Sequence, residues 1–230
     1  MFYRFWRSLI VALAYAVFGV QVRGRDRVPK GVFILAPSHR STLDIPFSAS
    51  VTGRRMRFMA KREIFHGKFW TWVFDELGAV PVDRDGGDRA ALRVVEAALL
   101  KGEPVVIFPE GTRRSGAELG ALFSGAAYLA LKQGVPIVPV GIGGSESVLV
   151  RRGPIKWFSR VCVVVGEPIT SERTSGTIKR SAITNTNDEL RARLQRCLDD
   201  ARKWSVVRNG GPMPEVEAGP SSGGESGQGV

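Results

Sequence analysis

The chain has 230 residues, 43% of them apolar and 24% charged, which excludes a disordered chain and fits one globular domain with extensions. Its formal net charge of +11 at pH 7 predicts an anionic partner, namely nucleic acid, a lipid surface or a phosphorylated substrate. Two cysteines, Cys162 and Cys197, exclude a disulfide framework and a cysteine-based metal cluster. Cys162 lies within VCVVV, which predicts a buried, unreactive thiol.

The first 24 residues differ in character from the rest of the chain. No charge occurs from Ser8 to Val22, and arginines flank this run on both sides. The run is shorter than the roughly 20 residues of a spanning helix. No cleavage pattern of a signal peptide follows it. Aromatic residues beside arginines are typical of the lipid headgroup region. We therefore expect residues 1–24 to form an interfacial, membrane-associating helical segment, with a helix packed on the domain, a short span or a signal as alternatives.

Residues 25–204 alternate apolar runs with amphipathic stretches. The apolar runs predict strands over residues 31–38, 54–61, 79–84, 104–111, 135–142 and 160–169. The amphipathic stretches predict helices over residues 67–78, 88–102 and 121–134. A last helix is expected from a capping box of Thr186 and Glu189 to about Trp204. Residues 205–230 are rich in glycine, serine and proline and predict a disordered tail.

This alternation predicts an α/β domain with a mostly parallel sheet flanked by helices. In such sheets ligands bind beyond the carboxyl ends of the strands. The turns at residues 37–44, 83–88 and 109–115 are therefore the places where a site is expected.

The first of these turns contains His39 and, five positions later, Asp44. On one regular helix five residues correspond to about 500° of rotation, so the two side chains would point roughly 140° apart. They can pair only if His39 lies in the turn before a helix and Asp44 in its first turn. Such a pair would make His39 a general base oriented by a carboxylate. Alone, the spacing favours a capping or core histidine beside a helix-initiating Asp. His66 has no metal-ligand spacing to its neighbours, so no metal is expected.

The other two turns contribute arginines. The second runs from Gly78 to Arg84 after an expected helix. The third, FPEGTR, ends a strand in a glycine turn with Glu110, Gly111, Thr112 and Arg113. An arginine at such an edge can grip a phosphate with two hydrogen bonds, and Glu110 could order that arginine or a substrate hydroxyl. Taken singly, each arginine is more often a solvated surface charge.

Taken in order, these motifs resemble those of the glycerolipid acyltransferase family, which includes lysophosphatidate and glycerol-3-phosphate acyltransferases. The resemblance covers roughly residues 25–170. It rests on H-x4-D (His39 to Asp44), the glycine–arginine block (Gly78 to Arg84), FPEGTR (Phe108 to Arg113) and VPIVPV (Val135 to Val140). The FPEGTR block matches in full and is the most specific of the four.

The resemblance implies a 1-acylglycerol-3-phosphate O-acyltransferase. The enzyme would move an acyl group from acyl-CoA or acyl carrier protein to the free hydroxyl of lysophosphatidate, giving phosphatidic acid for phospholipid synthesis. His39 and Asp44 would be catalytic. Arg84 and Arg113 would hold the acceptor phosphate, and Glu110, Gly111 and Thr112 would position substrate. The thioester is a co-substrate, and no bound cofactor is implied.

Two departures leave the acceptor open. Family members often carry Asn where this chain has Ser38, and a lysine where it has Ser124. His39-Arg40-Ser41 looks like the glycerol-3-phosphate type of the first block, whereas FPEGTR looks like the lysophosphatidate type. Glycerol 3-phosphate or another lysophospholipid is therefore the alternative acceptor.

Two rival classes are less well supported. A Ser–His–Asp lipase lacks its G-x-S-x-G elbow here. A non-catalytic basic module for anionic lipid or nucleic acid explains the charge but not the three polar turns. The expected location is the cytoplasmic face of the cell membrane, as a peripheral or monotopic protein contacting an anionic membrane surface and no nucleic acid.

Overall fold

The computed structural model describes residues 2–82, 87–148 and 157–211. Within them, seven strands form one sheet in the order β1-β7-β6-β2-β5-β3-β4. The strands are β1 (Gln21–Arg23), β2 (Ile34–Pro37), β3 (Arg57–Lys61), β4 (Ala79–Val82), β5 (Val105–Val106), β6 (Ile137–Gly143) and β7 (Cys162–Val165). Neighbouring strands run parallel except β6 and β7, which are antiparallel. The predicted mostly parallel sheet is therefore confirmed.

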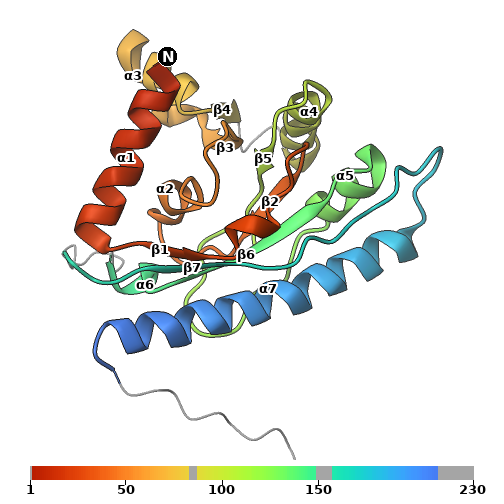
Figure 1. Cartoon of the computed structure of the whole chain (residues 1–230). Coiled ribbons are helices and arrows are strands. Elements are labelled where there is room, and N and C mark those ends of the chain that lie inside the picture. The colour runs from red at the N-terminus through yellow and green to blue at the C-terminus, as the bar shows by residue number, and fades with distance from the viewer. Residues whose placement is uncertain (1, 83–86, 149–156, 212–230) are drawn as a thin grey trace, which may run out of the picture.

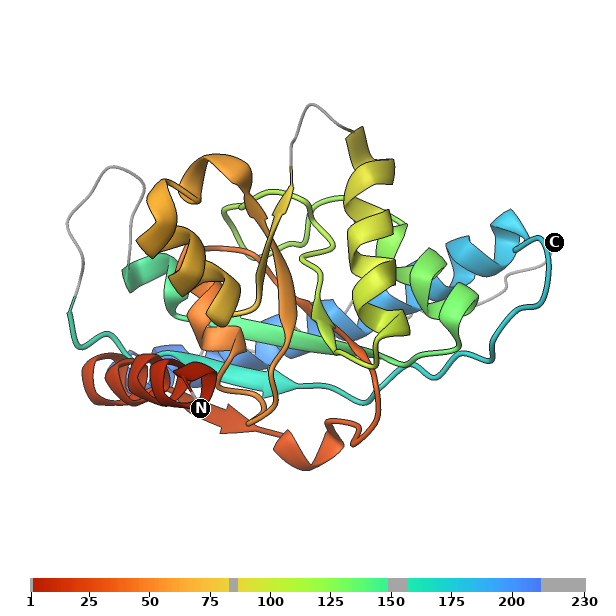
Figure 2. The same cartoon turned by 90° about the horizontal axis from the view of Figure 1, so that it is seen from above.

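Helices cover both faces of this sheet. They are α1 (Phe2–Phe18), α2 (Asp44–Ser48), α3 (Gly67–Glu76), α4 (Gly87–Leu100), α5 (Gly125–Gln133), α6 (Ser145–Val148) and α7 (Arg180–Arg208), with short 3-10 helices η1 (Arg25–Arg27) and η2 (Arg62–Ile64). Helix α7 runs along β6 and β7 (Figure 1). Figure 2 shows α1 beside the β1 edge of the sheet and α4 on the side of β3 and β4.

The central strand β2 divides the hydrophobic core into two layers. Side chains alternate across a strand, so Phe33 and Leu35 face one layer while Ile34 and Ala36 face the other. The first layer includes Phe47 and other residues around α1 and α2. The second includes buried residues of α4, α5 and α7. Burial on both faces explains why this strand reads as a continuous apolar run.

Helix α7 lies unusually close to β6 because two glycines of that strand face it. A Cβ atom added at Gly141 would lie 2.0 Å from the Cys197 carbonyl oxygen. One added at Gly143 would lie 2.3 Å from the carbonyl carbon of Ala201. Both positions therefore require glycine for the backbone of α7 to rest on the sheet.

The start and the end of helix α7 both differ from the predictions. The capping box of Thr186 and Glu189 is wrong, because the helix begins earlier, at Arg180, with Lys179 as its N-cap residue. Thr186 and Glu189 match a capping box by residue type, but they lie inside the helix, where the backbone N–H groups already have partners within the helix. At its other end the helix continues to Arg208, so residues 205–208, expected in the disordered tail, are helical.

Other boundaries are closer to expectation. The strand predicted over residues 104–111 is only Val105–Val106, because the chain then leaves the sheet for the FPEGTR turn. Gly78 does follow the end of α3, with φ of +91°. A Cβ atom there would lie 2.3 Å from the Met56 carbonyl oxygen, which explains the glycine.

The N-terminal segment forms a helix and then joins the sheet. Ala14 of α1 and the following Val20 are buried, and β1 pairs with β7. Phe5, Leu9 and Leu13 of α1 are exposed. In the described part of the chain, no helix has both the length and the apolar character needed to cross a membrane.

We predict that Gly141→Ala destabilises the fold by about 2 kcal/mol or more, because the added methyl group overpacks the contact with α7. The midpoint of urea unfolding measures this. Gly31→Ala is the matched control, since no atom lies within 4 Å of a Cβ atom added at Gly31. Equal midpoints for the two variants would contradict the prediction.

Candidate active site

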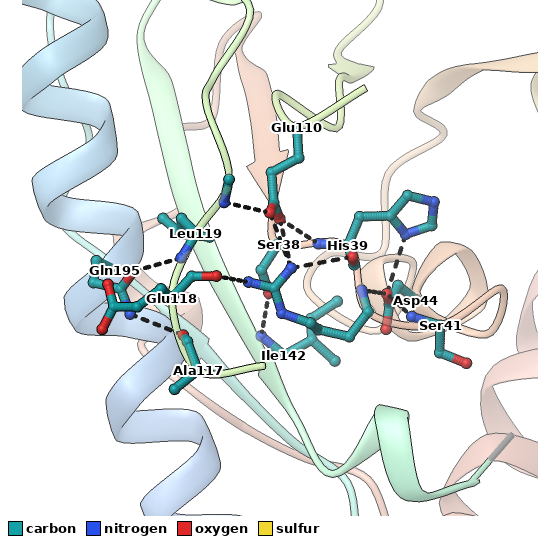
Figure 3. A network of polar contacts seen from close by, with 12 residues as sticks. Ser38, His39, Ser41, Asp44, Glu110, Ala117, Glu118, Leu119, Ile142 and Gln195 are labelled. Atoms are coloured by element: carbon teal, nitrogen blue, oxygen red, sulfur yellow. Dashed lines mark hydrogen bonds and ion pairs between the residues drawn. The ribbon is translucent and has the colours of Figure 1, made fainter. Parts of the chain in front are cut away.

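The site lies at the turn that connects β2 to α2. Strand β2 ends at Pro37 and α2 begins at Asp44, so His39 occupies the turn and Asp44 the first helical position. The imidazole Nδ1 lies 3.1 Å from Asp44 Oδ2. The expectation that the two residues can pair only in this arrangement is confirmed (Figure 3).

Asp44 Oδ2 is the acceptor for three N–H groups. Besides the imidazole, the backbone N–H groups of Arg40 and Ser41 donate to it, each at 2.6 Å. The Asp44 side chain is 0% exposed. Because Oδ2 already accepts two backbone N–H groups, we assign it as the acceptor of the imidazole too, which places the His39 proton on Nδ1 and leaves Nε2 as the basic nitrogen.

The His39 imidazole packs against Phe108, whose ring centroid lies 4.2 Å away. The side chain is 15% exposed, so it is confined but open to solvent. In Figure 3 its second ring nitrogen points away from Asp44. A ring fixed on one side by a carboxylate and open at the other nitrogen is suited to taking a proton from a bound hydroxyl.

The FPEGTR turn lies against the His39 turn. The backbone N–H of Arg114 donates to the His39 carbonyl oxygen at 2.9 Å. The Arg113 side chain is exposed and donates to Thr42 Oγ1 at 2.7 Å. The structure therefore brings an exposed guanidinium to the turn that holds His39.

Gly111 and Thr112 are exposed within the FPEGTR turn. Gly111 has φ of +65°, and a Cβ atom there would lie 2.6 Å from the ring of Phe123. Glycine is thus required at this position by both backbone conformation and space.

Glu110 departs from the expected arrangement. We expected its carboxylate at the sheet edge, ordering Arg113 or a substrate hydroxyl. It is instead 0% exposed and forms an ion pair with Arg40 at 2.9 Å. Its oxygens also accept the backbone N–H groups of His39 and Gly120, both at 3.1 Å. A carboxylate with these partners is directed into the protein.

Sequence reasoning missed the roles of Arg40 and Ser38. The sequence offers Arg40 only as a signal of acceptor type, whereas its side chain is buried and forms an ion pair with Glu110. The Ser38 hydroxyl is also buried and accepts the backbone N–H of Ile142 in β6 at 3.1 Å. The only sequence signal for the ion pair was that two opposite charges follow neighbouring strands.

Arg84 lies outside the described residues. Among the residues that are described, no group of three or more His, Cys, Asp or Glu side chains is placed to hold a metal ion. Cys162 and Cys197 are buried free thiols, as predicted for Cys162. Burial raises the pKa of Cys197 to about 11, so this thiol is a poor nucleophile near neutral pH.

The sequence and the fold match a known class of enzymes. The family model described as Acyltransferase matches residues 19–143, which is more than half of the chain. The chain therefore belongs to this family and is an enzyme of the O-acyltransferase type.

Individual relatives agree with this assignment. The chain is 27% identical over 218 residues to the 1-acyl-sn-glycerol-3-phosphate acyltransferase of Streptococcus pneumoniae, covering 93% of this chain and 79% of the relative. It is 29% identical over 171 residues to that of Bacillus subtilis, covering 73% and 82%. The crystal structure of the 1-acyl-sn-glycerophosphate (LPA) acyltransferase PlsC from Thermotoga maritima superposes with a TM-score of 0.67 at 24% identity, covering 86% of this chain and 80% of that one, which supports the fold.

Proposed function

We propose that the protein transfers a fatty acyl group from a thioester to the free hydroxyl of lysophosphatidate, giving phosphatidic acid. The observation that carries this proposal is the contact of His39 Nδ1 with the buried Asp44 carboxylate, which leaves Nε2 available as a base. The names of the relatives from Streptococcus pneumoniae and Bacillus subtilis supply the acceptor class.

The proposed reaction is direct acyl transfer. His39 Nε2 takes the proton of the acceptor hydroxyl while its oxygen attacks the thioester carbonyl carbon. Asp44 stabilises the imidazolium that forms. Collapse of the tetrahedral intermediate breaks the carbon–sulfur bond, and the thiolate leaves. A thiol has a pKa near 8.5, so departure needs no strong general acid, and the imidazolium proton returns to thiolate or solvent.

The acceptor phosphate is assigned to arginine. Arg113 supports this role because it is exposed and its Nη1 reaches Thr42, in the turn that holds His39. Arg84, which lies outside the described residues, is proposed as the second phosphate ligand. Gly111 and Thr112 form the exposed part of the turn along which the glycerol backbone is proposed to lie.

Acyl-CoA or acyl carrier protein is proposed as the donor, and no bound cofactor is required because the thioester supplies the activated acyl group. Glycerol 3-phosphate remains the second candidate acceptor, since it presents the same phosphate and hydroxyl chemistry. A basic module that only binds anionic lipid or nucleic acid is disfavoured because it leaves the ordered His39–Asp44 pair without a use.

Purified protein with acyl-CoA is expected to release free thiol when lysophosphatidate is added, and at least about tenfold more slowly with glycerol 3-phosphate. Release of thiol is followed spectrophotometrically, and the lipid product is identified by mass. Faster turnover with glycerol 3-phosphate would reassign the acceptor. Turnover with neither acceptor, from acyl-CoA or acyl carrier protein, would contradict the proposed function.

His39→Ala is expected to lower kcat by at least about 10³-fold, because the base is removed, a loss within the range that general-base catalysis contributes. Binding of lysophosphatidate should change little. The control is His66→Ala, which replaces the other histidine of the chain, an exposed residue. A kcat within tenfold of the parent for His39→Ala would remove His39 from the mechanism.

We also propose that α1 lies on the cytoplasmic face of the cell membrane. Its exposed Phe5, Leu9 and Leu13 would enter the lipid, and the net charge of +11 would favour anionic headgroups. The double variant Leu9→Glu/Leu13→Glu should lose flotation with anionic liposomes, while Leu100→Glu, at an exposed leucine of α4, should not. Unchanged flotation of the α1 variant would contradict this role.

A further inference from the structure

A buried ion pair joins the two turns of the site. Arg40 Nη1 lies 3.0 Å from Glu110 Oε1 and 2.9 Å from Oε2. The two side chains are 1% and 0% exposed. Removing two charges from water costs free energy that their attraction often does not recover, so a buried pair is weak support for stability. Its place beside the catalytic histidine indicates another use.

Both members of the pair hold the main chain of His39. Glu110 Oε1 accepts the His39 backbone N–H at 3.1 Å. Arg40 Nη1 donates to the His39 carbonyl oxygen at 3.3 Å. The backbone N–H of Arg40 in turn donates to Asp44 Oδ2 at 2.6 Å. The peptide groups on both sides of the His39 Cα atom are therefore fixed by the same charges.

The pair is itself anchored to the loop that follows FPEGTR and, through it, to α7. Arg40 Nη2 donates to the Glu118 carbonyl oxygen at 3.1 Å, and Gly120 N–H donates to Glu110 Oε2 at 3.1 Å. Gln195 of α7 accepts the Leu119 N–H at 2.9 Å and donates to the Ala117 carbonyl oxygen at 3.1 Å (Figure 3). The contacts form a continuous path from a long helix to the catalytic turn.

We propose that Arg40 and Glu110 are positioning residues that hold the His39 imidazole in register with Asp44, and that neither contacts the acceptor. The proposal rests on the proposed function of His39 as the base. Catalysis depends steeply on such placement, since a shift of about 1 Å can cost about 100-fold in rate. Arg113 differs from Arg40 in being exposed, so it remains the residue for the phosphate.

Arg40→Met and Glu110→Gln test the proposal, because Glu110→Gln keeps the shape of the side chain and Arg40→Met keeps an unbranched apolar stem without the guanidinium. The glutamine amide offers one acceptor and one donor group, whereas every contact of Glu110 requires an acceptor. Each variant should lower kcat on the order of 100-fold and leave the KM for lysophosphatidate within about threefold. The double variant should lose no more than the worse single one, because the pair acts as a unit. Arg40→Lys keeps the charge and should recover at least about tenfold over Arg40→Met.

A second ion pair provides the control for a purely structural role. Arg57 and Glu103 form two hydrogen bonds, of 2.9 Å and 3.1 Å. Arg57 begins β3 and Glu103 lies just before β5, so this pair is at the amino ends of parallel strands, opposite the catalytic turn. Arg57→Met and Glu103→Gln should lower the Tm while kcat stays within about twofold. The proposal fails if the Arg40 and Glu110 variants behave like these, or if they raise KM with kcat unchanged.

A readout without substrate separates this proposal from the proposed function. The chain has two histidines, so His66→Gln leaves His39 as the single imidazole in 1H–15N spectra. Neutral His39 in the parent should carry its proton on Nδ1. In Arg40→Met or Glu110→Gln the Nε2–H form should become populated, because the imidazole is no longer held in contact with Asp44. An unchanged tautomer in both variants would overturn the positioning role. A parent enzyme without transferase activity would reject the proposed function and leave this measurement decisive.

Discussion

The arrangement of the site depends on one carboxylate oxygen, Asp44 Oδ2. It accepts the His39 imidazole and two backbone N–H groups of the same turn, and the side chain has no contact with solvent. A buried carboxylate must have such donors, because an unpartnered one would carry a large desolvation cost. The hydrogen-bond donors that buried Asp44 requires therefore fix the conformation of the turn. This conformation places the His39 imidazole beside the carboxylate. The His39–Asp44 contact and the conformation of the turn thus share three hydrogen bonds at Oδ2, while the buried Oδ1 has no hydrogen-bond partner.

Glu110 is likewise a buried carboxylate surrounded by hydrogen-bond donors, and it links the His39 turn to the FPEGTR turn. Its carboxylate is buried, and its donors come from two stretches of chain: His39 and Arg40 in one turn, and Gly120 in the loop after FPEGTR. Arg113, three residues later, remains exposed beside Thr42. The FPEGTR motif thus provides both a buried carboxylate, Glu110, that holds the turns together and an exposed guanidinium, Arg113. The two residues are near neighbours in sequence, yet their surroundings assign them opposite tasks, because one is shielded from solvent and the other is not.

Features encoded locally could be predicted from the sequence, whereas features made by tertiary contact could not. Strand β2 was recognisable because it is buried on both faces. Helical geometry gave the one arrangement in which His39 and Asp44 could pair, and the family resemblance made that pairing the expectation. The start of α7 was misplaced at Thr186 because a capping-box pattern of residue types also occurs inside the helix, which begins at Arg180. The partner of Glu110 was not predictable, since Arg40 is an ordinary surface residue by composition, and only the meeting of β2 and β5 buries it.

The connection between α1 and the sheet has a mechanical consequence. Only Gly19 and Val20 separate α1 from β1, and this link is tied down on both sides. The Phe18 carbonyl oxygen accepts the Val161 N–H at 3.0 Å, and Arg208 at the end of α7 donates to the Gly19 carbonyl oxygen at 2.7 Å. The helix therefore cannot swivel independently of the sheet. If α1 lies in a lipid surface, the whole domain adopts one tilt and one height above it. The domain would then keep one fixed orientation relative to the lipid surface and would not move on a flexible tether.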